Sequence, residues 1–337
     1  MNAPRKNQRW IGFDLGGTKM LAAVFDDGLK QLARKRKKTR AHEGVEGGLD
    51  RMKSLIRDVL DEAKLTIDDV SGIGVGVPGP LDLNVGVVRE APNLGWVDVR
   101  LADLLQKEYG CPVVIANDVD LGVYGEFRCG AAKGSRCVVG VFPGTGIGGG
   151  CVYEGKILRG KTMSCMEIGH IPVIPDGPLC GCGLRGCLEA VASRLAVSAL
   201  AAAAAFRGQA PYLQKKTKTT LSEIRSSTLA TAIKNGDAAV EGILKTAADY
   251  IGRGVATIVH LIAPDVIILG GGLVEAMPEL IRKEVEKNAR RHILSSMQDT
   301  FKVVLAELDD DAATTGAAAW VQRTLAEPPA TAQFEST

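Results

Sequence analysis

Residues 10–25 read WIGFDLGGTKMLAAVF, two apolar runs on either side of the stretch Asp14-Leu-Gly-Gly-Thr-Lys19. Trp10–Asp14 and Met20–Phe25 are predicted to be strands, and Asp26-Asp27-Gly28 after them is a turn signal. The glycines therefore lie in a hairpin turn and not between a strand and a helix. This excludes a Rossmann fingerprint and a Walker loop here, because both need a helix directly after the glycine-rich turn.

The same pattern recurs in residues 138–155, VVGVFPGTGIGGGCVYEG, where a Gly144-Thr-Gly146 turn joins two apolar strands. Two Gly-Thr hairpins in one chain indicate an internal duplication, with one hairpin in each domain. Each turn offers backbone N–H groups and a threonine hydroxyl to an anion, and glycine lets the backbone approach a phosphate closely. Together the two hairpins predict phosphate binding.

Length and composition narrow the class of protein. A chain of 337 residues is expected to form two domains, since one domain averages roughly 150 residues. The 41 basic and 39 acidic residues give a net charge of +2, too small for a protein built around nucleic acid. The longest apolar stretch, Leu195–Phe206, is shorter than the ~20 residues of a membrane span, and no signal-peptide core is present. We expect a cytoplasmic protein with no membrane or nucleic-acid partner.

Hydrophobic patterning predicts an α/β chain. Further strands are predicted at Ile73–Val77, Val113–Ala116 and Val266–Leu269. Helices are predicted at Leu101–Tyr109, closed by Gly110, at Leu195–Phe206 and at 311–325, and the polar stretch Arg207–Lys218 is predicted to be a loop. The expected division is a disordered tail at 1–9, a small domain at 10–117 joined by helix 311–325, a larger domain at 118–310 and a disordered tail at 326–337.

Three of the eight cysteines, Cys180, Cys182 and Cys187, crowd into one short segment, and His170 precedes them. Three thiolates and one imidazole form a closed tetrahedral zinc set of the structural type, and the glycines at 181, 183 and 186 allow the tight turns that such a loop needs. The alternative is a group of buried thiols beside a histidine. The other cysteines are interpreted as small core residues: Cys111, Cys129, Cys137, Cys151 and Cys165.

Asp118 is a candidate catalytic base. It follows the strand at 113–116, where α/β folds place reactive groups, and Asn117 would cap the next helix. We expect the positive end of that helix to keep the Asp118 carboxylate ionised, so that it can accept a proton from an attacking hydroxyl. The alternative is an ordinary aspartate at a helix start. Glu167 and Glu189 flank the metal motif and suit hydrogen bonding to a polyol, although solvated glutamates are the common case.

Two other motifs need interpretation. Residues 155–162, GKILRGKT, match the Walker A pattern, but the interior is bulky and the glycine and proline after it preclude a helix, so no phosphate loop is expected. Residues 34–40, RKRKKTR, contain six basic residues. We interpret them as an exposed edge strand protected by charge, with an anionic partner such as polyphosphate or nucleic acid as the alternative.

The quoted motifs, with Glu167-x-Gly-His170 and Cys180-x-Cys-Gly-x-x-Gly-Cys-Leu-Glu189, resemble the ROK family of sugar kinases and repressors over about residues 10–322. Through the two hairpins the chain also resembles the wider actin-like ATPase and sugar-kinase fold. The resemblance implies two ribonuclease H-like α/β domains around a deep cleft, with a zinc-bound loop, and a homodimer or homotetramer.

The resemblance also implies site residues. Asp14 would hold Mg²⁺ through a water molecule, and Asp118 would be the base. The nucleotide would contact Gly16, Gly17, Thr18, Lys19, Gly144, Thr145, Gly146, Gly148 and Gly149, with its adenosine against Gly270 and Gly271. The sugar would be bound by Asn93, Asn117, Asp118, Glu167, His170 and Glu189. His170 would serve both zinc and sugar, with one ring nitrogen each.

The expected reaction is ATP-dependent phosphorylation of a hexose, first of all glucose to glucose 6-phosphate. N-acetylmannosamine, N-acetylglucosamine, fructose and other hexoses are alternative substrates, and polyphosphate is an alternative donor. A ROK-type regulator without catalysis is the alternative of another class, but the first hairpin leaves only nine residues before it, too few for a recognition helix. Cys165-Met166 and a short Asn93 loop depart from the common family pattern, in ways that bear on sugar preference.

Overall fold

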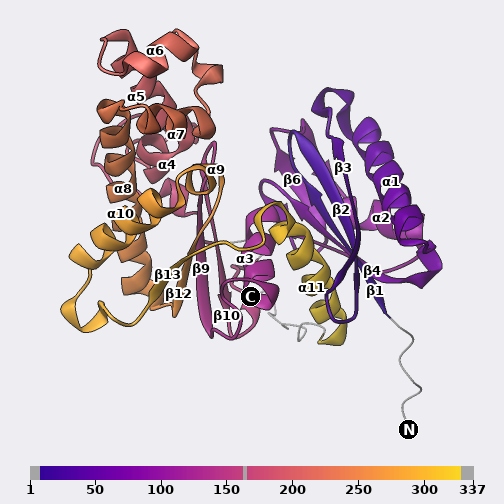
Figure 1. Ribbon diagram of the computed structural model, residues 1–337. Helices are drawn as coiled ribbons and strands as arrows, with labels where there is room; N and C mark the ends of the chain where they lie inside the picture. Colours follow the sequence, from indigo (N-terminus) through magenta and orange to yellow (C-terminus); the bar gives the residue numbers. More distant parts are fainter. Residues whose placement is uncertain (1–7, 162–164, 328–337) are drawn as a thin grey trace. The chain divides into compact units, whose positions relative to one another are not determined.

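The computed structural model describes residues 8–161 and 165–327, so the ends of both predicted tails lie outside the described residues. The chain divides into two compact units (Figure 1). Unit 1 comprises Met1–Gly134, Lys156–Cys165 and Asp310–Thr337, and unit 2 comprises Ser135–Gly155 and Met166–Asp309. Unit 2 is thus inserted into the sequence of unit 1.

The first boundary differs from the expected one at residue 117. Helix α3 (Asp118–Cys129) belongs to unit 1, because it packs along α11 (Ala312–Ala326), the predicted C-terminal helix. The Tyr124 ring of α3 meets the Trp320 ring of α11 edge-on, with 5.1 Å between ring centres.

The main sheet of unit 1 has the order β3-β2-β1-β4-β8. Its strands are β1 (Arg9–Leu15), β2 (Lys19–Asp26), β3 (Gln31–Lys38), β4 (Val70–Val77) and β8 (Val113–Asn117). β1 pairs antiparallel with β2 and parallel with β4, and β4 pairs parallel with β8. The predicted strands and the first hairpin are therefore confirmed.

The rest of unit 1 covers this sheet. α1 (Gly44–Ala63) buries Leu55 and Ile56 in the core, and α2 (Leu101–Tyr109) ends at Gly110 in the left-handed conformation, as predicted. A small antiparallel sheet contains β5 (Leu81–Asp82), β6 (Val87–Ala91) and β7 (Trp96–Val99). Short 3₁₀ turns occupy Ala41–Glu43, Ile67–Asp69 and Asp309–Asp311.

Glycines allow α11 to lie directly on the main sheet of unit 1. A Cβ atom at Gly12 of β1 would lie 1.9 Å from the Thr314 carbonyl oxygen, and one at Gly74 of β4 would lie 2.0 Å from that of Ala317. A Cβ at Gly316 of α11 would in turn lie 1.7 Å from the Leu121 carbonyl oxygen of α3. No side chain fits at these positions, so the three elements meet backbone to backbone.

Four strands of unit 2 lie in a second five-stranded sheet, whose order is β11-β10-β9-β12-β13. Its strands are β9 (Cys137–Pro143), β10 (Ile147–Tyr153), β11 (Lys156–Ile157), β12 (Val266–Leu269) and β13 (Lys302–Leu305). β9 pairs antiparallel with β10 and parallel with β12, and β12 pairs parallel with β13. This repeats the strand directions of unit 1, so the two hairpins belong to matching sheets, as an internal duplication predicts.

Helices make up most of the remainder of unit 2. They are α4 (Leu188–Ala192), α5 (Arg194–Phe206), α6 (Pro211–Thr217), α7 (Ser226–Lys234), α8 (Ala238–Ile262), α9 (Gly272–Ala276) and α10 (Pro278–Arg291). Short 3₁₀ turns are η3 (Ile168–His170), Leu221–Glu223 and Ser295–Met297. Together α4 and α5, Leu188–Phe206, are long and apolar enough to cross a membrane, by length and composition alone. Ser193 between them is extended, and both helices pack against α8.

Two sequence predictions are wrong in detail. Residues 207–218 are not a loop throughout, because α6 forms there: Pro211 starts the helix, and the buried Asp237 carboxylate accepts hydrogen bonds from the backbone N–H groups of Tyr212 (3.1 Å) and Leu213 (2.8 Å). Not all five remaining cysteines are core residues either. Cys129 is exposed at the end of α3.

Candidate functional site

The first hairpin turn, Gly16–Thr18, joins β1 to β2 and contacts a predicted sugar-binding residue. A Cβ at Gly17 would lie 2.9 Å from the Asn93 Cβ, and one at Gly16 would lie 2.8 Å from the Lys19 carbonyl oxygen. Both glycines are therefore required by close approach. The Thr18 side chain is exposed, and so is Asn93.

Thr39 holds this turn in place and was missed in the sequence. Its hydroxyl donates to the Gly16 carbonyl oxygen (2.5 Å), and its backbone N–H donates to that of Thr18 (2.9 Å). Thr39 is buried, and the Arg51 guanidinium bonds the neighbouring Lys38 carbonyl oxygen. Nothing in the sequence singled out Thr39, which lies inside the basic run at 34–40.

Acidic side chains of unit 1 surround the end of β1. Burial and the negative charges of Asp118 and Asp310 raise the pKa of Asp14 to about 7, and the nearby Lys19 ammonium opposes this rise. Lys19 also forms an ion pair with Asp310. The elevated pKa shows that negative charge at Asp14 is not fully compensated by this unit, which suits a bound divalent cation.

Asp118 lies at the start of α3, as predicted. The Asn117 side chain caps the helix by accepting from the backbone N–H groups of Val119 (2.9 Å) and Asp120 (3.2 Å). The Val119 N–H also lies 3.0 Å from the Asp118 carboxylate and lowers its pKa. Burial has the larger effect and raises that pKa. Desolvation therefore outweighs the hydrogen bond at the helix start, and the ionised state of the Asp118 carboxylate stays a prediction.

The second hairpin turn, Gly144–Gly146, lies in unit 2 and is closed by a bond from the Gly144 N–H to the Gly146 carbonyl oxygen (2.8 Å). The Glu189 carboxylate accepts from the Ile147 N–H (2.9 Å). A Cβ at Gly146 would lie 2.2 Å from that carboxylate, so a larger residue here would displace the Glu189 side chain. Glu189 is thus bonded to the hairpin that is expected to bind phosphate.

Arg194, a second residue missed in the sequence, is the first residue of α5 and adjoins this turn. Its guanidinium donates to the Thr145 hydroxyl (2.7 Å), and its backbone N–H donates to the Gly144 carbonyl oxygen (2.9 Å). Among the described residues Arg194 has no acidic partner within ion-pair distance. Only the fold reveals this position, because 49 residues separate Arg194 from Thr145.

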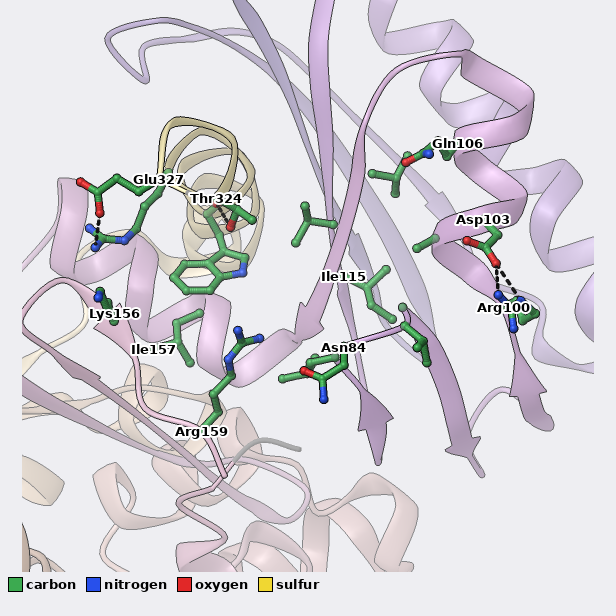
Figure 2. A pocket seen from close by; sticks show the side chains of 18 residues that line it. Asn84, Arg100, Asp103, Gln106, Ile115, Lys156, Ile157, Arg159, Thr324 and Glu327 are labelled. Carbon is green, nitrogen blue, oxygen red and sulfur yellow. Dashed lines mark hydrogen bonds and ion pairs between the residues drawn. The ribbon is translucent and has the colours of Figure 1, made fainter. Parts of the chain in front are cut away.

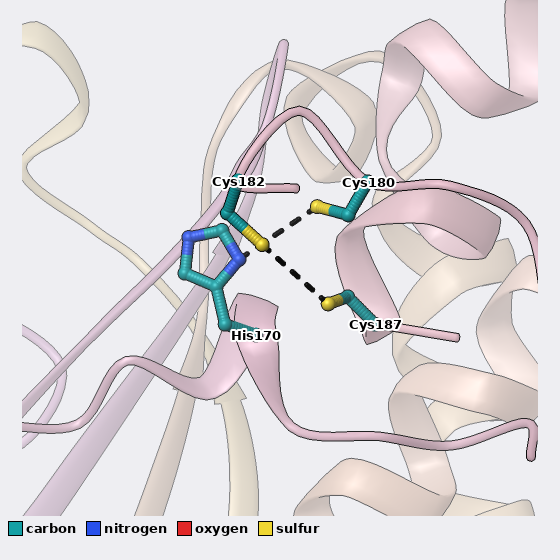
Figure 3. Close-up of side chains that lie close together, drawn as sticks. All are labelled: His170, Cys180, Cys182 and Cys187. Atoms are coloured by element: carbon teal, nitrogen blue, oxygen red, sulfur yellow. Dashed lines mark hydrogen bonds between the residues drawn. The ribbon is translucent and has the colours of Figure 1, made fainter. Parts of the chain in front are cut away.

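His170, Cys180, Cys182 and Cys187 converge, as the spacing predicts, and their ligand atoms all lie within 4.8 Å of one another (Figure 3). The Cys182 and Cys187 sulfurs are 3.8 Å apart, and the Cys180 sulfur is 3.8 Å from His170 Nδ1. Zinc–sulfur bonds of about 2.3 Å in a tetrahedron place two sulfurs about 3.8 Å apart. The four side chains therefore fit a tetrahedral metal ion.

Two of the predicted sugar ligands adjoin this metal site. Nδ1 of His170 faces the sulfurs, and its other ring nitrogen lies on the far side of the ring (Figure 3). The second Glu189 oxygen is 3.7 Å from the Cys180 sulfur. Glu189 therefore connects the metal cluster to the second hairpin. Glu167 is exposed and directly precedes η3, the turn that holds His170.

Gly270 and Gly271 follow β12 and form the start of α9. A Cβ at Gly270 would lie 2.6 Å from the Phe142 ring of β9, and Gly271 has a φ of +80° that favours glycine. The predicted adenosine contacts therefore lie beside the strand that leads into the second hairpin. A Cβ at position 149 of β10 would lie 2.7 Å from the Met166 carbonyl oxygen, so this position too requires glycine. Gly148 precedes it in the same strand.

The structure assigns the predicted site residues to both units. Unit 1 contains Asp14, Gly16, Gly17, Thr18, Lys19, Asn93, Asn117 and Asp118. Unit 2 contains Gly144, Thr145, Gly146, Gly148, Gly149, Glu167, His170, Cys180, Cys182, Cys187, Glu189, Gly270 and Gly271. Each unit thus supplies one hairpin and part of the expected sugar-binding set.

The two ambiguous motifs have structural explanations. In the Walker-like stretch Lys156–Ile157 is a strand, and residues 158–161 and 165–167 contain no helix, so the described residues lack the helix that a phosphate loop needs. The basic run lies in β3 at the edge of its sheet, also as predicted. Arg34, Lys35 and Lys37 form ion pairs with Asp311, Glu62 and Asp58 respectively.

Comparison with known proteins gives a consistent result. The sequence model described as the ROK family matches residues 10–324. The chain is 33% identical to a glucokinase of Thermotoga maritima, over 93% of this chain and 96% of that protein. It is similar to the structure of a ROK family glucokinase from Streptomyces griseus in complex with glucose and AMPPNP, at 32% identity and a TM-score of 0.79, over 93% of this chain and 98% of that one. A ROK hexokinase from Thermus thermophilus gives 33% identity and a TM-score of 0.77, over 92% and 97% of the two chains.

Proposed function

Because this chain belongs to the ROK family, we propose that it is an ATP-dependent sugar kinase that converts glucose to glucose 6-phosphate. The relatives named as glucokinases and hexokinases favour a kinase over a regulator. The observation that carries the proposal is Asp118, a half-buried carboxylate at the start of α3, with a raised pKa and in the same unit as the Gly16–Thr18 hairpin. A base of this kind is what phosphoryl transfer to a hydroxyl requires.

We propose that Asp118 accepts the proton of the attacking sugar hydroxyl. Desolvation makes its carboxylate a stronger base than an exposed aspartate. Asn93, Asn117, Glu167, His170 and Glu189 would bind the other hydroxyls and orient the ring. Holding the reacting oxygen in line with the phosphorus supplies much of the rate enhancement in reactions of this class.

Both hairpins would bind phosphate through backbone N–H groups. The uncompensated negative charge around Asp14 fits the Mg²⁺ that accompanies ATP, which would neutralise charge on the transferring group. Arg194 would add a side-chain cation at the second hairpin, where its guanidinium can exchange the Thr145 hydroxyl for a phosphate oxygen. Gly270 and Gly271 would lie against the adenosine.

We propose zinc as the ion at the His170 cluster, because three sulfurs and one imidazole nitrogen at tetrahedral spacing fit it. Its role would be structural. Bound zinc would anchor the segment from 170 to 187, fix the His170 ring through Nδ1 and hold Glu189 beside Cys180. The far ring nitrogen of His170 would then remain available to a sugar hydroxyl.

Asp118→Asn tests the reaction. ADP release with Mg-ATP is measured across a panel of glucose, fructose, N-acetylglucosamine and N-acetylmannosamine. Turnover of glucose should fall at least ~10³-fold in the variant, since a neutral amide cannot accept the proton. Asp249→Asn, which changes a half-buried carboxylate paired with Arg253 on α8, is the control and should keep wild-type turnover. If the protein phosphorylates another hexose and not glucose, that hexose replaces glucose as the proposed substrate. If the Asp118→Asn variant keeps its turnover, Asp118 is not the base.

Arg194→Ala tests the phosphate contact. We expect the KM for ATP to rise by about tenfold, the KM for glucose to change less than twofold, and Arg194→Lys to recover part of the loss. Thr145→Val separates the two roles of Arg194. If Arg194 acts only by holding the threonine hydroxyl, Thr145→Val will reproduce the effect of Arg194→Ala. If the guanidinium binds phosphate, Thr145→Val will be the milder change.

A further inference from the structure

A cavity of about 820 Å³ in unit 1 contains none of the residues assigned to the reaction above (Figure 2). Its walls come from the turn after β5, the start of α2, strand β8, the C-terminal half of α11 and residues 156–159. The Asn84 side chain donates to the Lys161 carbonyl oxygen (3.3 Å), which ties this last segment to the turn after β5. The cavity is therefore built from five parts of one unit.

One side of the cavity is apolar. Val113 and Ile115 of β8, Ile157 of β11 and Trp320 of α11 line it, and Figure 2 shows Ile115 and Ile157. Trp320 is held by its edge-on contact with Tyr124 of α3. Trp320 is largely buried, and the part of its indole that lines the cavity can pack against the C–H face of a sugar ring, since such a face is apolar.

The charged side chains of the cavity carry an excess of positive charge. Arg100 pairs with Asp103 (2.6 Å) and Arg323 with Glu327 (3.0 Å), so these four groups neutralise one another. Lys156 and Arg159 also line the cavity, and within the described part of the chain neither has an acidic partner. A ligand that fits this lining has two negative charges to pair with the two cations and an apolar face to pack on the apolar wall.

Uncharged polar groups complete the lining. The amides of Asn84 and Gln106 and the Thr324 hydroxyl line the same cavity, and the Thr324 hydroxyl already donates to the Trp320 carbonyl oxygen (2.8 Å). Amide groups both donate and accept hydrogen bonds, as recognition of several hydroxyl groups requires. A fatty acid or an aromatic acid would leave these groups unpaired, at a cost in affinity.

We propose that this cavity is a second ligand site, which binds a phosphorylated sugar apart from the reacting groups. Arg159 and Lys156 bind the phosphate, the Trp320 indole packs on the ring, and the amides of Asn84 and Gln106 bind hydroxyls. If the reaction is the one proposed above, glucose 6-phosphate is the ligand of this class that the enzyme itself produces. That identification rests on the proposed function, whereas the class of ligand does not.

Calorimetric titration with glucose 6-phosphate tests the proposal. The protein is first saturated with glucose and AMPPNP, so that the product cannot occupy the reaction site. We expect one further binding site per chain. Arg159→Gln and Lys156→Gln should each weaken binding at least tenfold, because each removes one of the two unpaired charges. Arg136→Gln is the matched control, a surface arginine paired with Glu154 outside the cavity, and should bind as the wild type does.

Three results would overturn the second site: no heat of binding in the saturated protein, binding that Arg159→Gln and Lys156→Gln leave unchanged, or inorganic phosphate binding as tightly as the sugar phosphate. Thermal unfolding of each variant is recorded so that loss of folding is not mistaken for loss of binding. The two proposals can also fail separately. If the wild-type protein does not phosphorylate glucose, yet binds glucose 6-phosphate in the absence of AMPPNP and loses this binding in Arg159→Gln, the proposed function is refuted and the second site is retained.

Discussion

At the scale of single residues, Asp14 is a group whose protonation changes near neutral pH. Its carboxyl follows β1, and burial together with Asp118 and Asp310 raises its pKa to about 7. In the folded protein the neutral form of Asp14 is therefore favoured relative to the unfolded chain, in which the pKa is ~3.9. The folded state binds more protons between these values, so its stability falls as the pH rises from about 4 to 7.

Asp14→Asn removes this pH dependence. We expect the free energy of unfolding of the variant at pH 8 to exceed that of the wild type by on the order of 3–4 kcal/mol, and the difference to shrink towards zero as the pH falls below about 4. Chemical denaturation from pH 4 to 8 in the absence of Mg²⁺ measures it. If the free energies of unfolding of the wild type and the variant differ by the same amount at every pH in this range, Asp14 keeps its ordinary pKa.

Thr39 affects the first hairpin through one hydroxyl group. In Thr39→Val the shape is kept but the bond to the Gly16 carbonyl oxygen is lost, so we expect a loss of stability of about 1–2 kcal/mol and a several-fold higher KM for ATP. Thr246→Val is the control, because that hydroxyl also donates to a glycine carbonyl oxygen, but on the exposed face of α8 (3.0 Å). Equal effects of both variants on KM would contradict a role for Thr39 in the hairpin.

The sequence predicts those site residues that belong to local motifs and misses those that depend on distant contacts. The cysteine cluster was predictable because its three thiols lie within one short segment, and Asn117 and Asp118 because a cap follows a strand. Thr39 and Arg194 act on turns 23 and 49 residues away. No local pattern marks such residues, since only the pairing of strands and the docking of α5 bring them to the turns.

At the scale of elements, the contact between α3 and α11 depends on glycine. A Cβ at Gly125 of α3 would lie 2.2 Å from the Ala312 carbonyl oxygen, whereas one at Gly122 of the same helix would meet nothing within 4 Å. Gly125→Ala should therefore destabilise unit 1 by about 1–3 kcal/mol or more, and Gly122→Ala should stabilise it by about 0.5–1 kcal/mol through helix propensity. Thermal unfolding of both variants measures this, and a shift of the same sign in both would refute the packing argument.

The metal loop is the second element whose integrity can be tested. Cys182→Ser should reduce bound zinc from one equivalent per chain and raise the KM for glucose, because His170 and Glu189 lose their anchor. Cys129→Ser, another exposed cysteine outside the cluster, is the control. Burial raises the pKa of Cys187 to about 12 in the metal-free protein, so zinc affinity should rise with pH as the thiols ionise. Full glucose affinity in zinc-free protein would contradict this role.

Helices and strands that have a clear pattern in their own sequence were predicted. Those that depend on contacts with distant parts of the chain were not. The helix at 101–109 has an amphipathic pattern and a closing glycine, and it forms as predicted. α6 has a mostly polar sequence, and the Asp237 carboxylate that caps it comes from a point 24 to 25 residues further along the chain. The hairpins were predicted because apolar runs and glycine turns alternate within a few residues.

At the scale of the whole molecule, the duplication explains why two similar hairpins occur in one chain. Each unit has a sheet in which the two strands of its hairpin pair antiparallel and the later strands pair parallel. The sequence predicted this duplication from the Gly-Thr turns alone. It could not place the boundary after α3, because the contact that assigns α3 to unit 1 comes from α11, nearly 200 residues later.

The glycine contacts of α11 also determine the order in which the chain can mature during translation. Strands β1 and β4 leave the ribosome well before α11, so their glycine face is covered only when Ala312–Ala326 has been synthesised. The segments of unit 2, up to Asp309, all emerge before that point. The sheet of unit 1 therefore stays uncovered while unit 2 is synthesised, and chaperones would bind it until α11 has emerged.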